Sequence, residues 1–195
     1  MIKPTAQTRD RLVEAALEAL KTVGFAGATS RAIARIGGFN QALIFYHYGS
    51  LDALLLAALD RTSEQRLARY REALAQVETI EELAELAARI YREDRETGHL
   101  TVVSQMVAGS LARPELAPEI AKRMEPWLEF AEEALGKVTK GTVLETALPL
   151  PDLAYAAVTY YLGVNLLANL DPERSRAEFE RAVDLAGLAG RLLRP

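Results

Sequence analysis

The chain has 195 residues, half of them apolar, with a formal net charge of −4 and a pI near 5.4. This length and composition fit one mid-sized globular domain, or a small domain followed by a larger one, and the acidic balance argues against general polyanion binding. There is no cysteine, which excludes disulfide bonds and thiolate metal sites. The N-terminal segment MIKPTAQTRDRL lacks the apolar core of a signal peptide. We therefore expect a cytoplasmic protein.

Apolar residues recur at helical spacing along most of the chain, and no useful stretch alternates as a strand would. Gly24 can end the first helix, and Ser50 can cap the long helix expected at 50–77. Asp171-Pro172 predicts the last turn. The expected helices cover about residues 8–23, 29–37, 40–48, 50–77, 80–96, 100–111, 117–136, 153–170 and 173–193. The sequence therefore predicts an all-α fold of about nine helices.

The segment from Ala28 to Leu51 has the form of a helix-turn-helix. Thr29 or Ser30 can cap its first helix, and Gly37 with Gly38 can end it, because glycine adopts the left-handed conformation that helix ends need. Asn40 can cap the second helix. Ile44 turns inward with Phe45 or Tyr48 beside it, and the residues expected to face outward are Gln41, Ala42, Leu43 and Tyr46.

Charge is distributed unevenly along the chain. Residues 1–50 carry six Lys or Arg and three Asp or Glu, a net charge of +3, although the whole chain is acidic. No acidic residue occurs between Ala19 and Leu51. A surface free of carboxylates avoids repulsion of phosphates, so this end of the chain is the one expected to bind nucleic acid.

The N-terminal segment resembles the tetracycline-repressor (TetR) family of bacterial transcription regulators. The matching positions are Thr29-Ser30, Ile33-Ala34, Gly38, Phe45, His47, Tyr48, Ser50 and Leu54. The chain departs from the family pattern at Ala42, Leu43, Phe45 and Leu51, where the family usually has glycine, threonine, tyrosine and lysine. The resemblance implies a helix-turn-helix domain at 1–52 and a helical ligand-binding and dimerisation domain at 53–195. It implies a repressor that binds a palindromic operator as a homodimer and is released by a small, largely apolar effector, without a cofactor.

Contacts to DNA are expected from the helix-turn-helix. Thr29, Ser30, Tyr46 and His47 are candidates for phosphate contacts, Gln41 can pair with adenine, and Leu43 can contact a thymine methyl group. Lys3 lies in an arm that can enter the minor groove. The full set of expected DNA-binding residues is Thr29, Ser30, Arg31, Asn40, Gln41, Ala42, Leu43, Tyr46 and His47.

The last helix carries small side chains at spacings of four, a pattern that lets another helix approach closely. The resemblance implies a dimer through the last two helices, which gives two reading heads for one palindrome. The expected interface residues are Tyr155, Leu162, Phe179, Ala182, Val183, Ala186 and Gly190. The alternative is that both helices belong to the core of one chain, since buried helices are also apolar all round.

A small-molecule pocket is implied in the second domain. Its candidate residues are polar or polarisable side chains on otherwise apolar helices, which suits a mostly apolar cavity with few orienting groups. They are Tyr91, Gln105, Met106, Trp127, Tyr161 and Asn165. Each of them can instead be an ordinary core residue.

Three other interpretations were considered. Glu96 and His99 have the E-x-x-H spacing of a di-iron enzyme, but Gly98 lies between them and no second copy is present. A helical protein-interaction module without DNA binding stays an alternative, because Phe45 and Leu51 depart from the family pattern. The uncharged stretch at 153–170 approaches membrane-spanning length, but its polar residues favour a buried helix.

Overall fold

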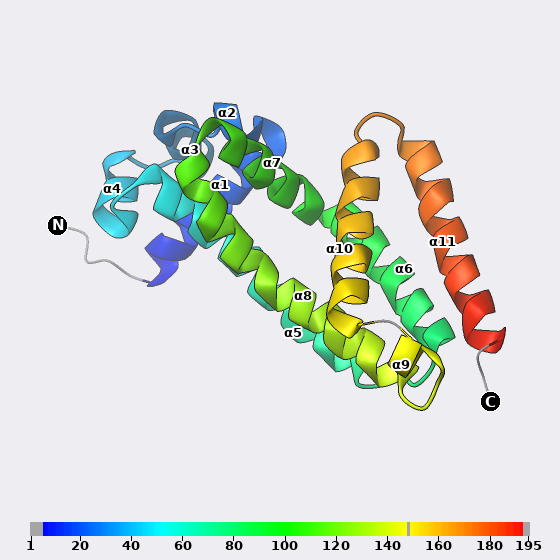
Figure 1. The fold of residues 1–195 in the computed structure, drawn as a ribbon. Helices are drawn as coiled ribbons and strands as arrows, with labels where there is room; N and C mark the ends of the chain where they lie inside the picture. Colours follow the sequence, from blue (N-terminus) through cyan, green and yellow to red (C-terminus); the bar gives the residue numbers. More distant parts are fainter. Residues whose placement is uncertain (1–5, 148, 193–195) are drawn as a thin grey trace. The chain divides into compact units, whose positions relative to one another are not determined.

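The computed structural model describes residues 6–147 and 149–192, and within these ranges the secondary structure is helical, without a strand (Figure 1). The chain begins with α1 (Ala6–Thr22), α2 (Gly24–Gly27), α3 (Ser30–Gly37), α4 (Ala42–Tyr48), α5 (Leu51–Leu74) and α6 (Ile80–Thr97). It continues with α7 (His99–Ala112), the 3-10 helix η1 (Pro114–Leu116), α8 (Ala117–Thr139), α9 (Leu144–Ala147), α10 (Leu150–Leu167) and α11 (Pro172–Leu192). The all-α prediction is confirmed.

All the predicted helices are present, with shifted ends. α10 begins at Leu150, earlier than predicted, because Pro149 occupies the N-cap and a second proline fits the first turn, where no backbone donor is needed. α8 continues through Pro126 to Thr139 as one helix. The short helices α2, α9 and η1 were not predicted, since three or four residues are too few to show a helical period.

The chain divides into two compact units. Unit 1 contains residues 1–65 and 101–123, and unit 2 contains residues 66–100 and 124–195. The continuous helices α5 and α8 each contribute to both units. The predicted domain limits, 1–52 and 53–195, stay a prediction.

Unit 1 is built on α1, which packs against α3 and α2. Its fully buried side chains come from successive helices: Leu12 and Leu20 from α1, Ile33 from α3, Ile44 from α4 and Leu54 from α5. Burial of each such aliphatic side chain contributes about 1.5–3 kcal/mol. The helix-turn-helix is therefore held against α1 by apolar contacts.

Polar contacts also join α5, α7 and α8 within unit 1. The amide N–H of Phe25 donates to Gln105 Oε1 at 2.8 Å, and the Arg113 guanidinium lies 5.3 Å from the centre of the Phe25 ring. Within unit 1, α5 forms ion pairs through Asp52 with Arg113, Asp60 with Arg123, and Arg61 with Asp10. Unit 1 is thus more than a helix-turn-helix, because α7 and the start of α8 pack with it.

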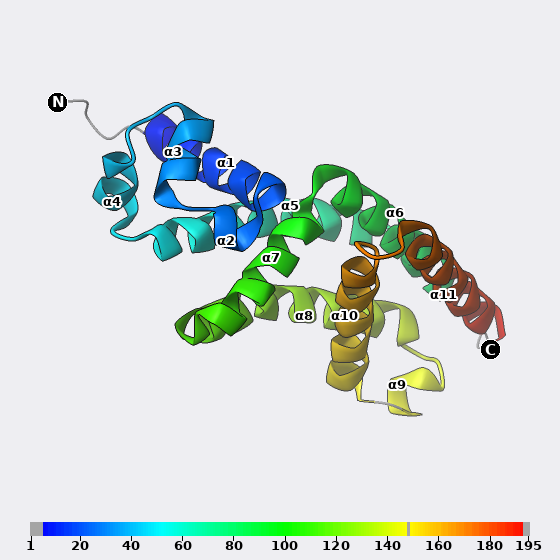
Figure 2. The same ribbon diagram turned by 90° about the horizontal axis from the view of Figure 1, so that it is seen from above.

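In unit 2, α11 packs along α6, and the two helices run side by side in both ribbon views (Figure 2). One buried cluster joins α5, α6 and α8 and contains Leu67, Tyr70, Leu74, Val77, Leu86, Ile90, Phe130, Ala134 and Val138. A smaller cluster joins α6, α10 and α11 through Tyr91, Val164 and Phe179. These clusters form the core of unit 2.

No single helix in the described ranges is both long enough and apolar enough to cross a membrane. The pair α4 and α5 meets the limits of length and composition together, with a bend of 69° between its two helices.

Candidate nucleic-acid interface

The first helix of the helix-turn-helix is capped by Thr29. Its Oγ1 accepts a hydrogen bond from the N–H of Ala32 at 3.2 Å, and its backbone is extended, as N-cap residues usually are. Ser30 is the first helical residue, so of the two predicted caps the structure selects Thr29. Within α3, the side chains of Ile33 and Ala34 are buried, whereas that of Ile36 is exposed.

The turn depends on two glycines for different reasons. Gly38 has φ 63° and ψ 44°, the left-handed conformation, and its N–H donates to Ala34 O. At Gly37, a Cβ atom would lie 2.1 Å from the Phe39 ring, so a side chain there would displace Phe39 from the turn. Asn40 Oδ1 accepts from the N–H of Ala42 at 2.9 Å, which satisfies a free donor at the start of α4.

The outer face of α4 differs in part from the prediction. Ile44 is fully buried, and Gln41 and Ala42 are exposed; Tyr46 is 67% exposed. Leu43 is only partly exposed, because it lines a hollow of about 380 Å³ beside α1, together with Gln7, Thr8, Arg11, Leu12 and Phe39. Tyr48 rather than Phe45 is the half-buried aromatic residue.

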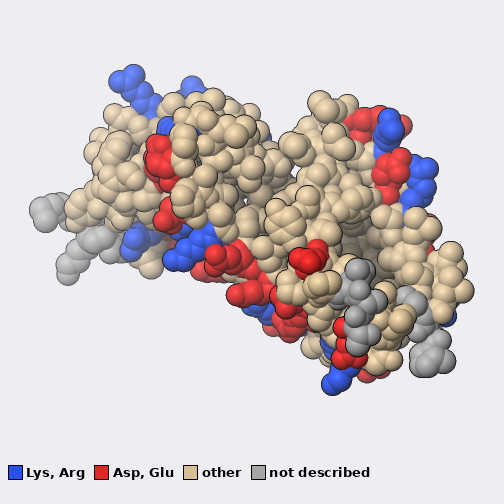
Figure 3. Space-filling model, viewed as in Figure 1, with Lys and Arg blue, Asp and Glu red and all other residues tan. Residues whose placement is uncertain are grey.

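α4 presents aromatic and amide groups rather than charge. The surface over α4 is tan in Figure 3, because its sequence ALIFYHY contains no Lys, Arg, Asp or Glu. The Tyr46 and His47 rings meet edge to face, with centroids 5.1 Å apart. The exposed Arg31 and Arg35 on α3 supply positive charge beside it. Lys3 lies outside the described residues.

Two arginines of α1 bind the carboxyl ends of α3 and α4. Arg11 Nε donates to Gly37 O at 2.9 Å, and its Nη2 donates to Gly38 O at 3.0 Å. Arg9 Nη2 donates to His47 O at 3.4 Å. The sequence interpretation counted both side chains only as positive charge, since nothing in the local sequence shows which carbonyl groups they meet.

In unit 2, the predicted ligand-binding residue Tyr161 belongs to a buried polar cluster centred on Asp94, which is 1% exposed. The hydroxyls of Tyr161 and Tyr70 donate to the Asp94 carboxylate at 2.7 and 2.8 Å, and Arg66 forms an ion pair with it. Burial raises the pKa of Asp94, with Arg66 opposing the change. Burial and the Asp94 charge raise the pKa of Tyr161 well above 10. Asp94 was not predicted as a site residue, because it lies in the charged segment YREDRE, where a carboxylate is expected to be exposed.

The other predicted ligand-binding residues are divided between the units. Tyr91, Trp127 and Asn165 lie in unit 2, where the Asn165 amide donates to Tyr161 O at 2.7 Å and Trp127 packs near Tyr70. Gln105 and Met106 lie in unit 1; Gln105 binds the Phe25 amide, and Met106 is fully buried. The six residues therefore do not form one cluster within either unit.

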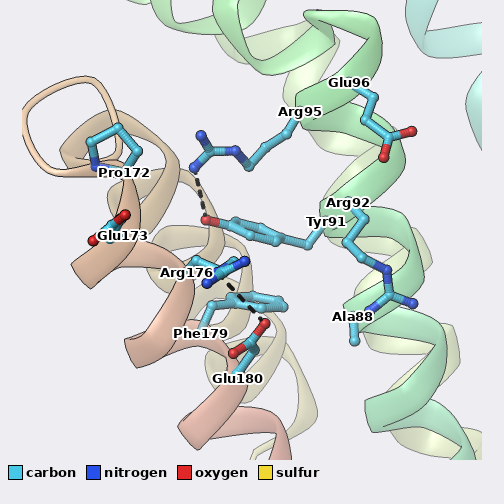
Figure 4. A pocket seen from close by; sticks show the side chains of 10 residues that line it. All are labelled: Ala88, Tyr91, Arg92, Arg95, Glu96, Pro172, Glu173, Arg176, Phe179 and Glu180. Atoms are coloured by element: carbon cyan, nitrogen blue, oxygen red, sulfur yellow. Dashed lines mark hydrogen bonds and ion pairs between the residues drawn. The ribbon is translucent and has the colours of Figure 1, made fainter.

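A groove of about 380 Å³ opens between α6 and α11. Its floor is the stacked pair Tyr91 and Phe179, with ring centroids 4.1 Å apart. Figure 4 shows the hydrogen bond from Arg95 to the Tyr91 hydroxyl and the ion pair between Arg176 and Glu180. The groove walls carry both positive and negative side chains.

The predicted dimer residues differ in exposure: Tyr155 is exposed, whereas the five residues on α11 are buried or partly buried. Phe179 is buried against Tyr91, and Gly190 is buried where a Cβ would lie 2.8 Å from Ile80 Cβ, so both face α6 of their own chain. Val183 packs against the same core, while Leu162, Ala182 and Ala186 are partly buried. The exposed large apolar side chains of α10, α11 and the turn between them are Tyr155, Tyr160, Leu166, Leu167, Leu170, Leu185, Leu188 and Leu192.

Glu96 and His99 lie on different helices. Gly98, with φ 72°, ends α6 between them, and His99 begins α7. Residues 6–147 and 149–192 contain no group of three or more His, Cys, Asp or Glu side chains placed to hold a metal ion.

Part of the chain matches a known protein family. Residues 12–58, which include the helix-turn-helix, match the family described as "Bacterial regulatory proteins, tetR family". The HTH-type transcriptional regulator UidR of Escherichia coli K12 is 24% identical over 193 residues, which span 95% of this chain and 93% of that protein. The predicted resemblance to the TetR family is therefore confirmed, with the family match at residues 12–58. These matches support a DNA-binding transcriptional regulator, and the matched family is one of regulators.

Solved structures show the same fold as this chain. FadR from Bacillus subtilis, crystallised with stearoyl-CoA, superposes with a TM-score of 0.73 at 15% identity over 91% of this chain and 96% of FadR. The multidrug binding protein EbrR, crystallised with imidazole, superposes with a TM-score of 0.62 at 26% identity over 92% of this chain and 95% of EbrR.

Proposed function

We propose that this TetR-family regulator is a repressor that binds a palindromic operator as a homodimer and is released by a small-molecule effector. The observation that carries the proposal is the geometry of α3 and α4. A capped helix, a left-handed Gly38 and a second helix with an exposed outer face form a reading head that fits the major groove of DNA.

The proposed contacts come from exposed or partly exposed side chains of α3, α4 and the residues that precede them. Gln41 is exposed at the start of α4, where its amide can pair with the N6 and N7 atoms of adenine. Ala42 beside it is small enough to allow close approach to the bases. Phosphate contacts come from Tyr46 and His47 on α4, and from Thr29, Ser30 and Arg31 around the start of α3. These contacts set the position of α4 on the duplex. Asn40 acts through its cap on α4 and Leu43 through apolar contact, with α1 on one side and a thymine methyl group on the other.

The homodimer is proposed to form through the exposed apolar faces of α10 and α11. Leu166, Leu167, Leu185 and Leu192 lie exposed on these helices, and burying such surface is the main source of free energy in most protein association. The predicted Tyr155 belongs to this surface, whereas Phe179 and Gly190 support it from inside the chain. A dimer places two reading heads on two half-sites, so the second contact becomes intramolecular.

The effector is proposed to bind in unit 2. Tyr91, Trp127, Tyr161 and Asn165 are aromatic or amide groups in an otherwise apolar core, and Asp94 adds a buried polar anchor among them. The structural relatives FadR and EbrR were crystallised with stearoyl-CoA and with imidazole, which makes a small molecule the reasonable kind of effector here. An effector releases DNA only to the extent that it binds the DNA-free state more tightly. Residues 1–52 would then read DNA, and residues 53–195 would bind effector and partner.

Titration of the purified full-length protein against its own upstream DNA tests the proposal. The double variant Gln41→Ala, Tyr46→Ala should bind that DNA on the order of a hundredfold more weakly, because a lost base pairing is worth about 1–3 kcal/mol in each half-site. Gln65→Ala, at an exposed position on α5, is the matched control and should bind as the wild type does. Equal binding by the wild type and the double variant would rule out α4 as the reading helix.

A further inference from the structure

We infer that Arg11, with Arg9 beside it, is a positioning residue that holds α3 and α4 in their reading geometry and does not neutralise phosphate. The inference rests on the proposed DNA binding of this unit. It separates two of the six basic residues in positions 1–50 from the charge that contacts DNA.

Arg11 binds the carboxyl end of α3. The last carbonyl groups of a helix have no partner within that helix, and they carry the negative end of its dipole. Arg11 reaches across from α1 and donates to two of them, Gly37 O at 2.9 Å and Gly38 O at 3.0 Å. The planar fork of a guanidinium group suits two neighbouring oxygen atoms, whereas the single ammonium group of lysine has no such fork.

The turn is attached to α1 by this contact. Gly38 adopts the left-handed conformation, and the N–H of Phe39 donates back to Ala34 O at 3.0 Å. Arg11 also lines the hollow beside Phe39 and Leu43. Arg11 thus binds two carbonyl groups of the turn and lines the same hollow as Phe39 and Leu43, and so restrains the angle between α3 and α4.

Arg9 makes the corresponding contact at the carboxyl end of α4. Its Nη2 donates to His47 O at 3.4 Å, and its own carbonyl group accepts from the Tyr48 hydroxyl at 3.3 Å. The guanidinium also lies 5.2 Å from the centre of the Tyr48 ring. Both reading helices are therefore held from α1 by their carboxyl ends.

Salt dependence distinguishes a positioning arginine from a phosphate contact. Each neutralised phosphate contributes about 0.9 to the slope of the logarithm of affinity against the logarithm of salt concentration, so one lost contact per subunit lowers the slope of a dimer by about 2. An arginine that acts through the turn changes affinity at every salt concentration by the same factor. Its replacement leaves the slope unchanged.

The experiment compares full-length Arg11→Met, Arg11→Lys and Arg9→Met with the control Arg31→Met, an exposed arginine on α3 proposed to contact phosphate. Fluorescence anisotropy on the upstream DNA is measured across a range of potassium chloride, well below the thermal unfolding midpoint. We expect about tenfold weaker binding for Arg11→Met and for Arg11→Lys, with an unchanged slope. Arg9→Met should behave in the same way, whereas Arg31→Met should lower the slope by about 2.

Hydrogen exchange of the free protein gives a readout that does not need DNA. The Phe39 amide, bonded to Ala34 O, should exchange faster in Arg11→Met than in the wild type. A slope reduced by about 2 in Arg11→Met, or unchanged affinity together with unchanged Phe39 exchange, would overturn the inference. Failure of the wild type to bind any upstream DNA would count against the proposed function instead. The exchange measurement would still test whether Arg11 holds the turn in place.

Discussion

The Tyr161 hydroxyl on α10 donates a hydrogen bond of 2.7 Å to Asp94 Oδ2 on α6, inside the core of unit 2. The other carboxylate oxygen accepts from Tyr70 on α5 and pairs with Arg66. One carboxylate thus connects three helices. Because a buried charge is costly unless all of its oxygens are paired, this cluster restrains how α5, α6 and α10 can pack.

Removal of the Tyr161 hydroxyl should destabilise the protein. Tyr161→Phe leaves a buried oxygen of Asp94 without its donor, which costs about 1–3 kcal/mol in the free energy of unfolding. Urea denaturation followed by circular dichroism measures this change. Tyr160→Phe is the matched control, because the Tyr160 side chain is exposed and its hydroxyl donates to a backbone carbonyl group, Glu178 O. Its change in the free energy of unfolding should stay below about 0.5 kcal/mol. Equal effects of the two variants would contradict a special role for Asp94.

Tyr161 should also make the free energy of unfolding depend on pH in the alkaline range. Its pKa in the folded chain lies well above 10, so above pH 10 the native state keeps a proton that the unfolded state loses. Stability therefore falls as pH rises through this range, and Tyr161→Phe lacks that contribution. The difference in free energy of unfolding between wild type and variant should shrink as the pH is raised from 9 to above 10. A difference that stayed constant or grew would show that burial does not raise the pKa of Tyr161.

Gly109 and Gly163 are helical glycines expected to respond in opposite ways to alanine. A Cβ at Gly109 would lie 2.4 Å from the Phe25 ring, so Gly109→Ala should displace that ring and destabilise the chain by about 1–3 kcal/mol. Gly163, in α10, has no atom within 4 Å of its Cβ position, and alanine there should stabilise the helix by about 0.5–1 kcal/mol. Thermal unfolding of both variants checks the contrast, and destabilisation of equal size would refute it.

The proposed dimer surface can be tested with charged substitutions of exposed leucines. Leu185 on α11 is 66% exposed in the single chain, and Leu185→Glu should yield a monomer, because a carboxylate would be buried at the interface. Leu111 at the end of α7 is 86% exposed, and Leu111→Glu should leave the dimer intact. Light scattering after size exclusion gives the mass of each variant. A dimeric Leu185→Glu protein would place the interface elsewhere.

Part of the candidate site could be predicted from sequence, because it depends on local chemistry. Thr29 and Asn40 act on backbone groups two or three residues away, and Gly38 ends its own helix. Arg11 acts on Gly37 O and Gly38 O across the interface between α1 and α3, and its sequence context is that of any charged residue on a helix surface. Leu43 was expected to face outward because the helical period alone does not show the hollow beside α1.

The amino-acid sequence by itself determined the all-α class, the order of the helices and the helix-turn-helix, because periodicity, caps and glycines act within a few residues of one another. Only the tertiary structure decided that Asp94 is a buried centre rather than a surface charge, and that Phe179 stacks on Tyr91 instead of facing outward. The physical reason is distance along the chain. Burial and pairing depend on which helix faces a residue, and that partner lies tens of residues away.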